Sequence, residues 1–235
     1  GDRVVHLDRK SESYGLNKPL IGYGIQYADI NNSEWEKIST WEDGYRKMLF
    51  FHPNINYKKY PNDLSSINNM SDDKVIEMAI SLDKGYSKDE IADIAFDMRN
   101  INTKWIWLDT FSKAQMNEFK EDVKSNDPTS CGIIESQVRG LNYDYNNGNI
   151  YLGITDINGM YNSWLNYLRD GNENNITNEV NKSLYEQLIK DGKDNASNIK
   201  ILGFIVEGTK EELNKLVNKP YIKASTFGVV IDSLY

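Results

Sequence analysis

The chain has 235 residues, of which 39% are hydrophobic and 11% aromatic, enough for one or two domains with a sizeable core. Lysine and arginine total 27 against 35 aspartate and glutamate, a formal net charge of −8, which argues against a nucleic-acid-binding protein and against electrostatic binding to anionic lipid. The single cysteine, Cys131, excludes an intramolecular disulfide, and no window reaches the ~18 apolar residues of a membrane span.

An amphipathic helix is predicted near the N-terminus. Asn31-Asn32-Ser33-Glu34 is typical of a helix start, and tryptophan, isoleucine, tyrosine and leucine residues recur beyond it at helical spacing. We therefore predict a helix over Ser33–Phe50, which ends before His52-Pro53 because proline does not continue a helix.

The polar stretch Asn54–Asn69 is predicted to be a loop and the domain boundary. It divides the chain into a helical or irregular N-terminal segment, residues 1–70, and a main domain, residues 71–235. The chain begins Gly1-Asp2-Arg3 without an initiator methionine, which leaves room for a membrane segment upstream of it. We expect residues 1–70 to be the part nearest the membrane.

The main domain opens with a predicted strand, helix and strand. Val75–Leu82 is apolar and of strand length. Ser87 is the expected N-cap of the helix, with Glu90 three residues later as its capping-box partner. Residues 91, 94, 95 and 98 form an apolar helix face, and Lys104–Asp109 is the second strand.

The middle of the chain is less regular. Ser112–Lys124 is compatible with a short helix, and Asn147-Gly148 between alternating apolar residues predicts a hairpin. Asn158–Asp170 and Val180–Lys190 are predicted to be amphipathic helices.

The last 40 residues repeat the strand, helix, strand order. Ile199–Val206 is a predicted strand, Thr209 and Glu212 form a second capping box, and Tyr221–Ile231 is the closing strand. Two such β-α-β units sharing one mixed or antiparallel sheet predict an α+β fold, a ferredoxin-like sandwich with an inserted hairpin and helices.

The sequence offers no recognisable catalytic, cofactor-binding or metal-binding set. His6, His52 and Cys131 are too few and too scattered for the usual zinc sites, and no common catalytic or nucleotide-binding motif is present. Trp105 and Trp107 share one strand face, which fits either core packing or a sugar-stacking platform. A carbohydrate-binding module or a glycoside-active enzyme with a carboxylate pair at the cell surface therefore stays open as an alternative.

Three stretches resemble the sigma factor regulator C-terminal domain family. The first two, EMAISLDKGYSKDEIADI and KWIWLDT, resemble the opening of that family. The third, ILGFIVEGTKEELNKLVNKPYIKASTFGVVID, resembles its closing motif, and the three together bracket residues 73–232. The resemblance suggests that Gly208-Thr209 and Lys223-Ala224-Ser225 are turn and packing determinants.

The resemblance implies a membrane-anchored anti-sigma factor of a Gram-positive bacterium. Its cytoplasmic part, absent from this chain, would hold an extracytoplasmic-function sigma factor, a single helix would cross the membrane, and this chain would lie outside the cell. The family supplies no catalytic residue, cofactor or metal, so we expect a non-enzymatic regulatory domain. Its further partners would be another membrane protein, a cell-wall component or a second copy of the chain, and not a nucleic acid.

Overall fold

The computed structural model describes residues 25–39, 41–42, 45–125, 132–143, 157–171 and 176–232. A five-stranded antiparallel sheet forms its centre, with the strand order β7-β6-β8-β5-β9. The strands of this sheet are β5 (Lys74–Tyr86), β6 (Asn102–Leu108), β7 (Arg139–Asn142), β8 (Ile201–Thr209) and β9 (Ile222–Asp232).

The sheet contains two interleaved β-α-β units. Both β5 and β6 run antiparallel to β8, which lies between them, so β5 and β6 are parallel to each other. In the same way, β8 and β9 flank β5 and are parallel to each other. This split arrangement is the ferredoxin-like topology, extended by β7 at one edge, and it confirms the predicted fold class.

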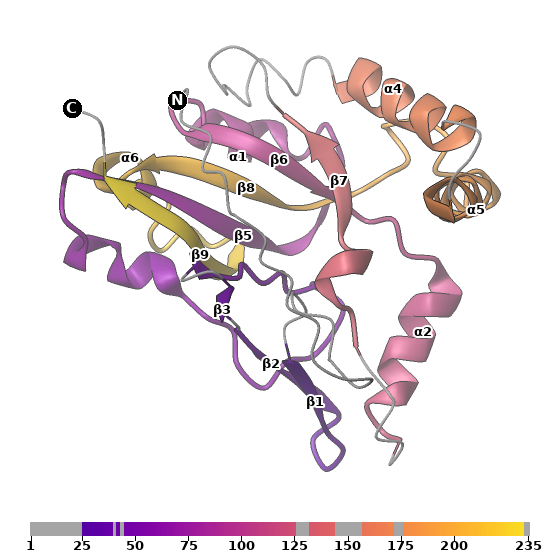
Figure 1. Cartoon of the computed structure of the whole chain (residues 1–235), viewed down its shortest axis with the longest axis horizontal. Helices are drawn as coiled ribbons and strands as arrows, with labels where there is room; N and C mark the ends of the chain where they lie inside the picture. The colour runs from indigo at the N-terminus through magenta and orange to yellow at the C-terminus, as the bar shows by residue number, and fades with distance from the viewer. Residues whose placement is uncertain are drawn as a thin grey trace.

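Short helices connect the strands, and longer ones lie at the β7 edge, where Figure 1 shows α4 and α5 beyond the sheet. The helices are α1 (Ala92–Asp97), α2 (Lys113–Asp122), α4 (Ile157–Asp170), α5 (Ile176–Lys190) and α6 (Lys210–Asn214), with 3-10 turns η1 (Asp63–Asn69) and η2 (Glu135–Gln137).

Both predicted capping boxes are confirmed. The Ser87 main-chain N–H donates to the Glu90 carboxylate and the Glu90 N–H donates to Ser87 Oγ, although the regular part of α1 begins five residues later. Thr209 and Glu212 bond reciprocally at the start of α6. The helices at residues 112–124, 158–170 and 180–190 are also confirmed, as α2, α4 and α5. The hairpin predicted at Asn147-Gly148 lies outside the described residues.

The helix predicted over Ser33–Phe50 is wrong. That stretch holds β2 (Glu34–Ile38), which pairs with β1 (Ile25–Asp29), and the short pair β3 (Trp41–Glu42) and β4 (Tyr45–Arg46). The expected helix start is the turn of the β1–β2 hairpin. There the Asp29 carboxylate accepts the N–H groups of Asn31 and Asn32, and Ser33 has a φ of 54°, which a helix does not allow.

The sheet is covered on both faces, by two separate hydrophobic cores. One core lies between the sheet and α1, α4, α5, α6 and η1. The other lies between the opposite face and a mixed group of N-terminal and central residues, among them Trp35, Leu49, Phe51 and Phe119. The stretch predicted to be a loop, residues 54–69, ends in η1, whose Leu64 and Ile67 are buried in the first core.

Candidate functional site

The main chain of residues 49–51 crosses the second face of the sheet and is bonded to hydroxyl groups of two strands. The Leu49 N–H donates to Thr226 Oγ1 over 2.9 Å, and the Thr226 hydroxyl donates to the Leu49 carbonyl over 3.1 Å. The Phe51 N–H donates to Ser81 Oγ over 3.0 Å. Ser81 and Thr226 are fully buried, so these hydroxyls satisfy main-chain groups that water does not reach.

The same strand, β9, binds the chain that follows. Ser225 accepts the Leu64 N–H at its Oγ and donates its own N–H to the Pro61 carbonyl. The Lys223 ammonium donates to the Pro53 carbonyl over 2.9 Å. The motif Lys223-Ala224-Ser225, expected to be a packing determinant, is thus confirmed as one. We call the contact of residues 49–64 with β5 and β9 the junction.

A polar cluster lies at one end of the junction, where β6 ends. The His52 imidazole is fully buried, and its ring packs edge-on against the rings of Trp107 and Phe111. Its Nε2 lies 3.7 Å from Asp109 Oδ1, and neither atom has a hydrogen-bond partner within the described part of the chain. Lys193, from the loop after α5, donates to the carbonyls of Asp109 and Phe111.

This cluster joins three distant parts of the sequence. Burial pushes the pKa of Asp109 upward, but the nearby His52 and Lys193 favour the carboxylate more strongly, and the pKa is lowered from its ordinary value. A group with a lowered pKa stabilises the fold above its ordinary titration range and loses that contribution as the pH falls through the folded-state value. The junction is therefore expected to weaken in acid.

Replacing Asp109 tests this expectation. We expect Asp109→Asn to lower the free energy of unfolding by about 1–2 kcal/mol at neutral pH, because the negative charge that lies 3.7 Å from His52 Nε2 and 3.9 Å from Lys193 Nζ is lost. The difference between variant and parent should begin to shrink below about pH 4, where the Asp109 carboxylate of the unfolded chain takes up a proton, and should be lost once the pH has fallen through the lower folded-state pKa. Urea unfolding across this pH range measures both effects, with Asp89→Asn, at an exposed carboxylate, as the control. A difference independent of pH would contradict the assignment.

A buried lysine fixes the β1–β2 hairpin beside the junction. The Lys37 side chain is 0% exposed, and its ammonium donates to Glu135 Oε1 over 2.8 Å and to the Phe50 carbonyl over 2.9 Å. The rings of Phe51 and Tyr57 have their centroids 5.7 and 5.8 Å from its Nζ. Burial lowers the pKa of Lys37, and the Glu135 carboxylate acts in the opposite direction.

The two tryptophans of β6 belong to the second core. Trp107 is fully buried, and the Phe50 ring lies 5.1 Å from the Trp107 ring and 5.5 Å from that of Trp105. A Cβ atom added to Gly140 of β7 would come within 2.5 Å of a Trp105 ring atom, so the indole covers this glycine. Packing, and not an exposed sugar-stacking platform, is therefore the role of this pair.

One pair of carboxylates does face across the sheet. Glu77 of β5 lies directly opposite Glu207 of β8, whose carboxylate is 3.7 Å from Lys104 Nζ. Burial, helped by the charge of Glu207, raises the pKa of Glu77, while the Val229 N–H donates to its carboxylate and opposes this. Glu77 thus serves as an acceptor for β9 main chain where that strand is bulged.

The raised pKa predicts that Glu77 destabilises the fold at neutral pH. A raised pKa means that the stabilising contribution is complete at low pH and is lost as the pH rises through the folded-state value. We expect Glu77→Gln, which keeps an oxygen for Val229, to raise the free energy of unfolding by about 0.5 kcal/mol at pH 7 by removing a like charge opposite Glu207. The gain should vanish below about pH 4 in denaturant titrations. A loss of stability at pH 7 would show that the ionised carboxylate is required.

Sequence reasoning missed the junction. No sequence motif marks the residues that form it, which are Ser81, Thr226, Asp109 and Lys193. The only sequence feature that could have indicated the junction is a hydroxyl residue within an otherwise apolar strand, as at Ser81 and Thr226. His6, Cys131 and residues 144–148 lie outside the described residues. Among the described residues, no group of three or more histidine, cysteine, aspartate or glutamate side chains could hold a metal ion. None of the helices in the described ranges has the length and apolar character of a membrane span.

Comparison with known proteins places the chain in a family. The family model described as sigma factor regulator C-terminal matches residues 67–229, more than half of the chain. No curated protein and no solved structure matches the chain. The match spans both β-α-β units and the edge strand β7, and it begins within η1. The chain therefore belongs to the sigma factor regulator C-terminal family, and is a regulatory domain of an anti-sigma factor.

Proposed function

We propose that this domain lies outside the cell and is the non-enzymatic sensor or partner-binding part of a membrane-anchored anti-sigma factor in a Gram-positive bacterium. The cytoplasmic part of the same protein would hold an extracytoplasmic-function sigma factor, and one helix would cross the membrane between them. Residues 1–70 would be the membrane-proximal segment and residues 71–235 the domain proper. Membership of the family supports this proposal.

The junction is the observation that carries the proposal. With the membrane helix on the N-terminal side, a signal received by the sheet would pass to the membrane through the segment that precedes the sheet in the chain. Here Thr226 and Ser81 bind that segment at Leu49 and Phe51 through buried hydrogen bonds. A partner that binds one arrangement of the junction better than another would shift the population of the two, which is the physical requirement for regulation.

A transcription reporter in the full-length regulator tests the proposal. Replacing residues 1–235 by an unrelated folded domain should change sigma-dependent transcription under envelope stress. Thr226→Val removes the hydroxyl and keeps the shape, so it should shift the reporter at unchanged protein abundance. Thr226→Ser keeps the hydroxyl and is the matched control. Unchanged output after replacement of the whole domain would refute the regulatory role.

A further inference from the structure

The strand β7 leaves one edge of the sheet open. It pairs only with β6 among the described strands, and the Tyr143 N–H just beyond it donates to the Lys104 carbonyl. In an antiparallel ladder alternate residues point toward the partner strand, so Arg139 and Leu141 bond to β6. The main-chain groups of Gly140 and Asn142 consequently point away from the sheet, and neither residue bonds through them to any described residue.

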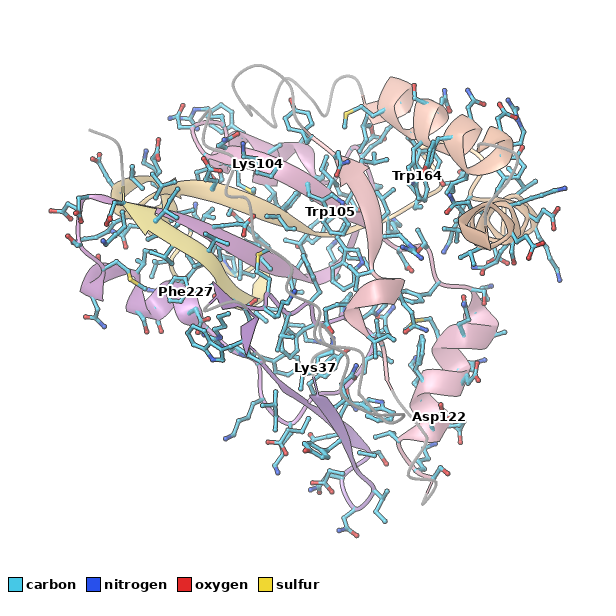
Figure 2. The ribbon with its side chains drawn as sticks, in the orientation of Figure 1. Lys37, Lys104, Trp105, Asp122, Trp164 and Phe227 are labelled. Atoms are coloured by element: carbon cyan, nitrogen blue, oxygen red, sulfur yellow. The ribbon has the colours of Figure 1, made fainter. Side chains whose placement is uncertain are left out.

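A groove of about 630 Å³ runs along this edge. Residues 140–142 of β7 line it on the sheet side, and residues of α4 line it on the opposite side. Gly159 and Ser163, one helical turn apart, leave space on that face of α4. Met160, Trp164 and Tyr167 line the groove beside them, and the Tyr167 side chain is 61% exposed. Figure 2 shows Trp164 on the side of α4 toward β7.

One cation lies at the start of the strand. Arg139 is exposed and makes no ion pair among the residues that the structure describes. It shares a strand face with Leu141, whose side chain packs in the core that contains α4 and α5. Arg139 also lines a second hollow of about 190 Å³, together with Val180 and Leu184 of α5. Arg139 directly precedes Gly140, the first residue that lines the groove, and so places a positive charge at this end of β7 for a carboxylate of an occupant.

We propose that β7 binds an extended segment of a partner protein as a sixth strand of the sheet. The open donors and acceptors repeat every second residue, which matches an extended backbone and not a helix, whose main-chain groups are already bonded to each other. Alternate side chains of the segment, apolar or aromatic, would lie against Trp164 and Tyr167, and an acidic one would pair with Arg139. This inference rests on the proposed function, because it assigns the partner surface of that regulatory domain.

The test uses random twelve-residue peptides displayed on phage and selected on the 235-residue chain. The blocking variant is Asn142→Pro, which removes an outward N–H that β6 does not use, and proline is tolerated on edge strands. Asn142→Thr keeps the N–H and is the matched control. Selected peptides should show alternating apolar residues with an acidic residue. Their affinity should fall at least about tenfold with Asn142→Pro, a loss of about 1.4 kcal/mol, and less than about twofold with Asn142→Thr.

Two further variants keep the test decisive if proline perturbs the strand. Tyr167→Ala removes an exposed ring and should also weaken binding about tenfold, whereas Tyr167→Phe should not. Arg139→Gln should weaken only peptides that carry the acidic residue. Hydrogen exchange adds a direct readout: the amides of Gly140 and Asn142 should exchange fast in the free chain and slowly with peptide bound, while Leu141 is slow in both states.

Several outcomes would overturn the inference. The inference fails if the selected peptides bind the Asn142→Pro variant as tightly as the parent chain, or if the selection enriches no peptide. It also fails if the amides of Gly140 and Asn142 are already protected from hydrogen exchange in the free chain. Binding of an N-acetylglucosamine hexamer in place of peptides would assign the groove to a glycan. If Asn142→Pro leaves the reporter of the full-length regulator unchanged while replacement of the domain alters it, the proposed function stands and only this surface assignment fails.

Discussion

Replacing Trp107 by alanine should remove about 4 kcal/mol from the free energy of unfolding, close to the full cost of emptying a tryptophan site in a packed core. Trp107 is fully buried at the centre of the second core, in contact with the rings of Phe50 and His52. Its loss should also loosen the junction, so the amides of Leu49 and Phe51, now bonded to Thr226 and Ser81, should exchange faster. Guanidinium unfolding and hydrogen exchange measure the two effects.

Two matched variants separate packing from other causes. Trp107→Phe keeps a ring against Phe50 and removes an indole N–H that has no partner among the described residues, so it should cost less than about 1.5 kcal/mol. Trp41, which is 68% exposed, provides the surface control, and Trp41→Ala should change stability by less than about 0.5 kcal/mol. A cost at Trp107 no larger than that at Trp41 would mean that the second core does not hold the N-terminal segment on the sheet.

The parts of the fold that sequence reasoning predicted are those that local rules determine. The capping boxes of Ser87 with Glu90 and of Thr209 with Glu212 act within three residues, and their side chains bond as expected. The strands next to them are apolar runs that only a buried sheet accommodates. The two units repeat the same order of strand, helix and strand, and each helix has an apolar face that must be buried. A single sheet on which both helix faces pack could therefore be predicted.

The N-terminal strands were missed because their apolar residues mimic helical spacing. Trp35 is buried, but Ile38 and Trp41 of the same supposed helix face are 43% and 68% exposed. Burial of Trp35 depends on the remote residue Phe119, whose carbonyl accepts the indole N–H. Tertiary contacts of this kind, across 84 residues, leave no periodic trace in the sequence.

The junction and the open edge were beyond prediction for a related reason. Thr226 and Leu49 are 177 residues apart, and nothing in either neighbourhood specifies the other. The strand β7 has four residues and includes Gly140, a residue that usually weakens a strand. The ring of Trp105 covers that glycine where β7 pairs with β6, and this contact is visible only once the sheet is assembled.

Replacing Lys37 by methionine should lower the free energy of unfolding by about 3 kcal/mol, because breaking a buried ion pair leaves the other charge poorly solvated. The ammonium bonds to Glu135 and to the Phe50 carbonyl, and the Glu135 side chain is 18% exposed. Lys58 forms the matched surface pair with Glu36, at 46% and 30% exposure, and Lys58→Met should cost less than about 0.5 kcal/mol.

The double variant with both Lys37→Met and Glu135→Met tests whether charge itself is needed. Well-packed apolar replacements of a buried pair are often neutral, so the double variant should recover most of the loss from Lys37→Met. The lowered pKa of Lys37 adds a pH signature. Between the folded and unfolded pKa values the unfolded chain binds more protons, so the stability of the parent relative to Lys37→Met should rise as the pH increases toward 10.5. A double variant as unstable as Lys37→Met alone would show instead that most of the cost comes from the Phe50 carbonyl, which loses its hydrogen-bond donor in both variants. The hydrogen bond to Phe50, more than the ion pair with Glu135, would then hold the hairpin on the sheet.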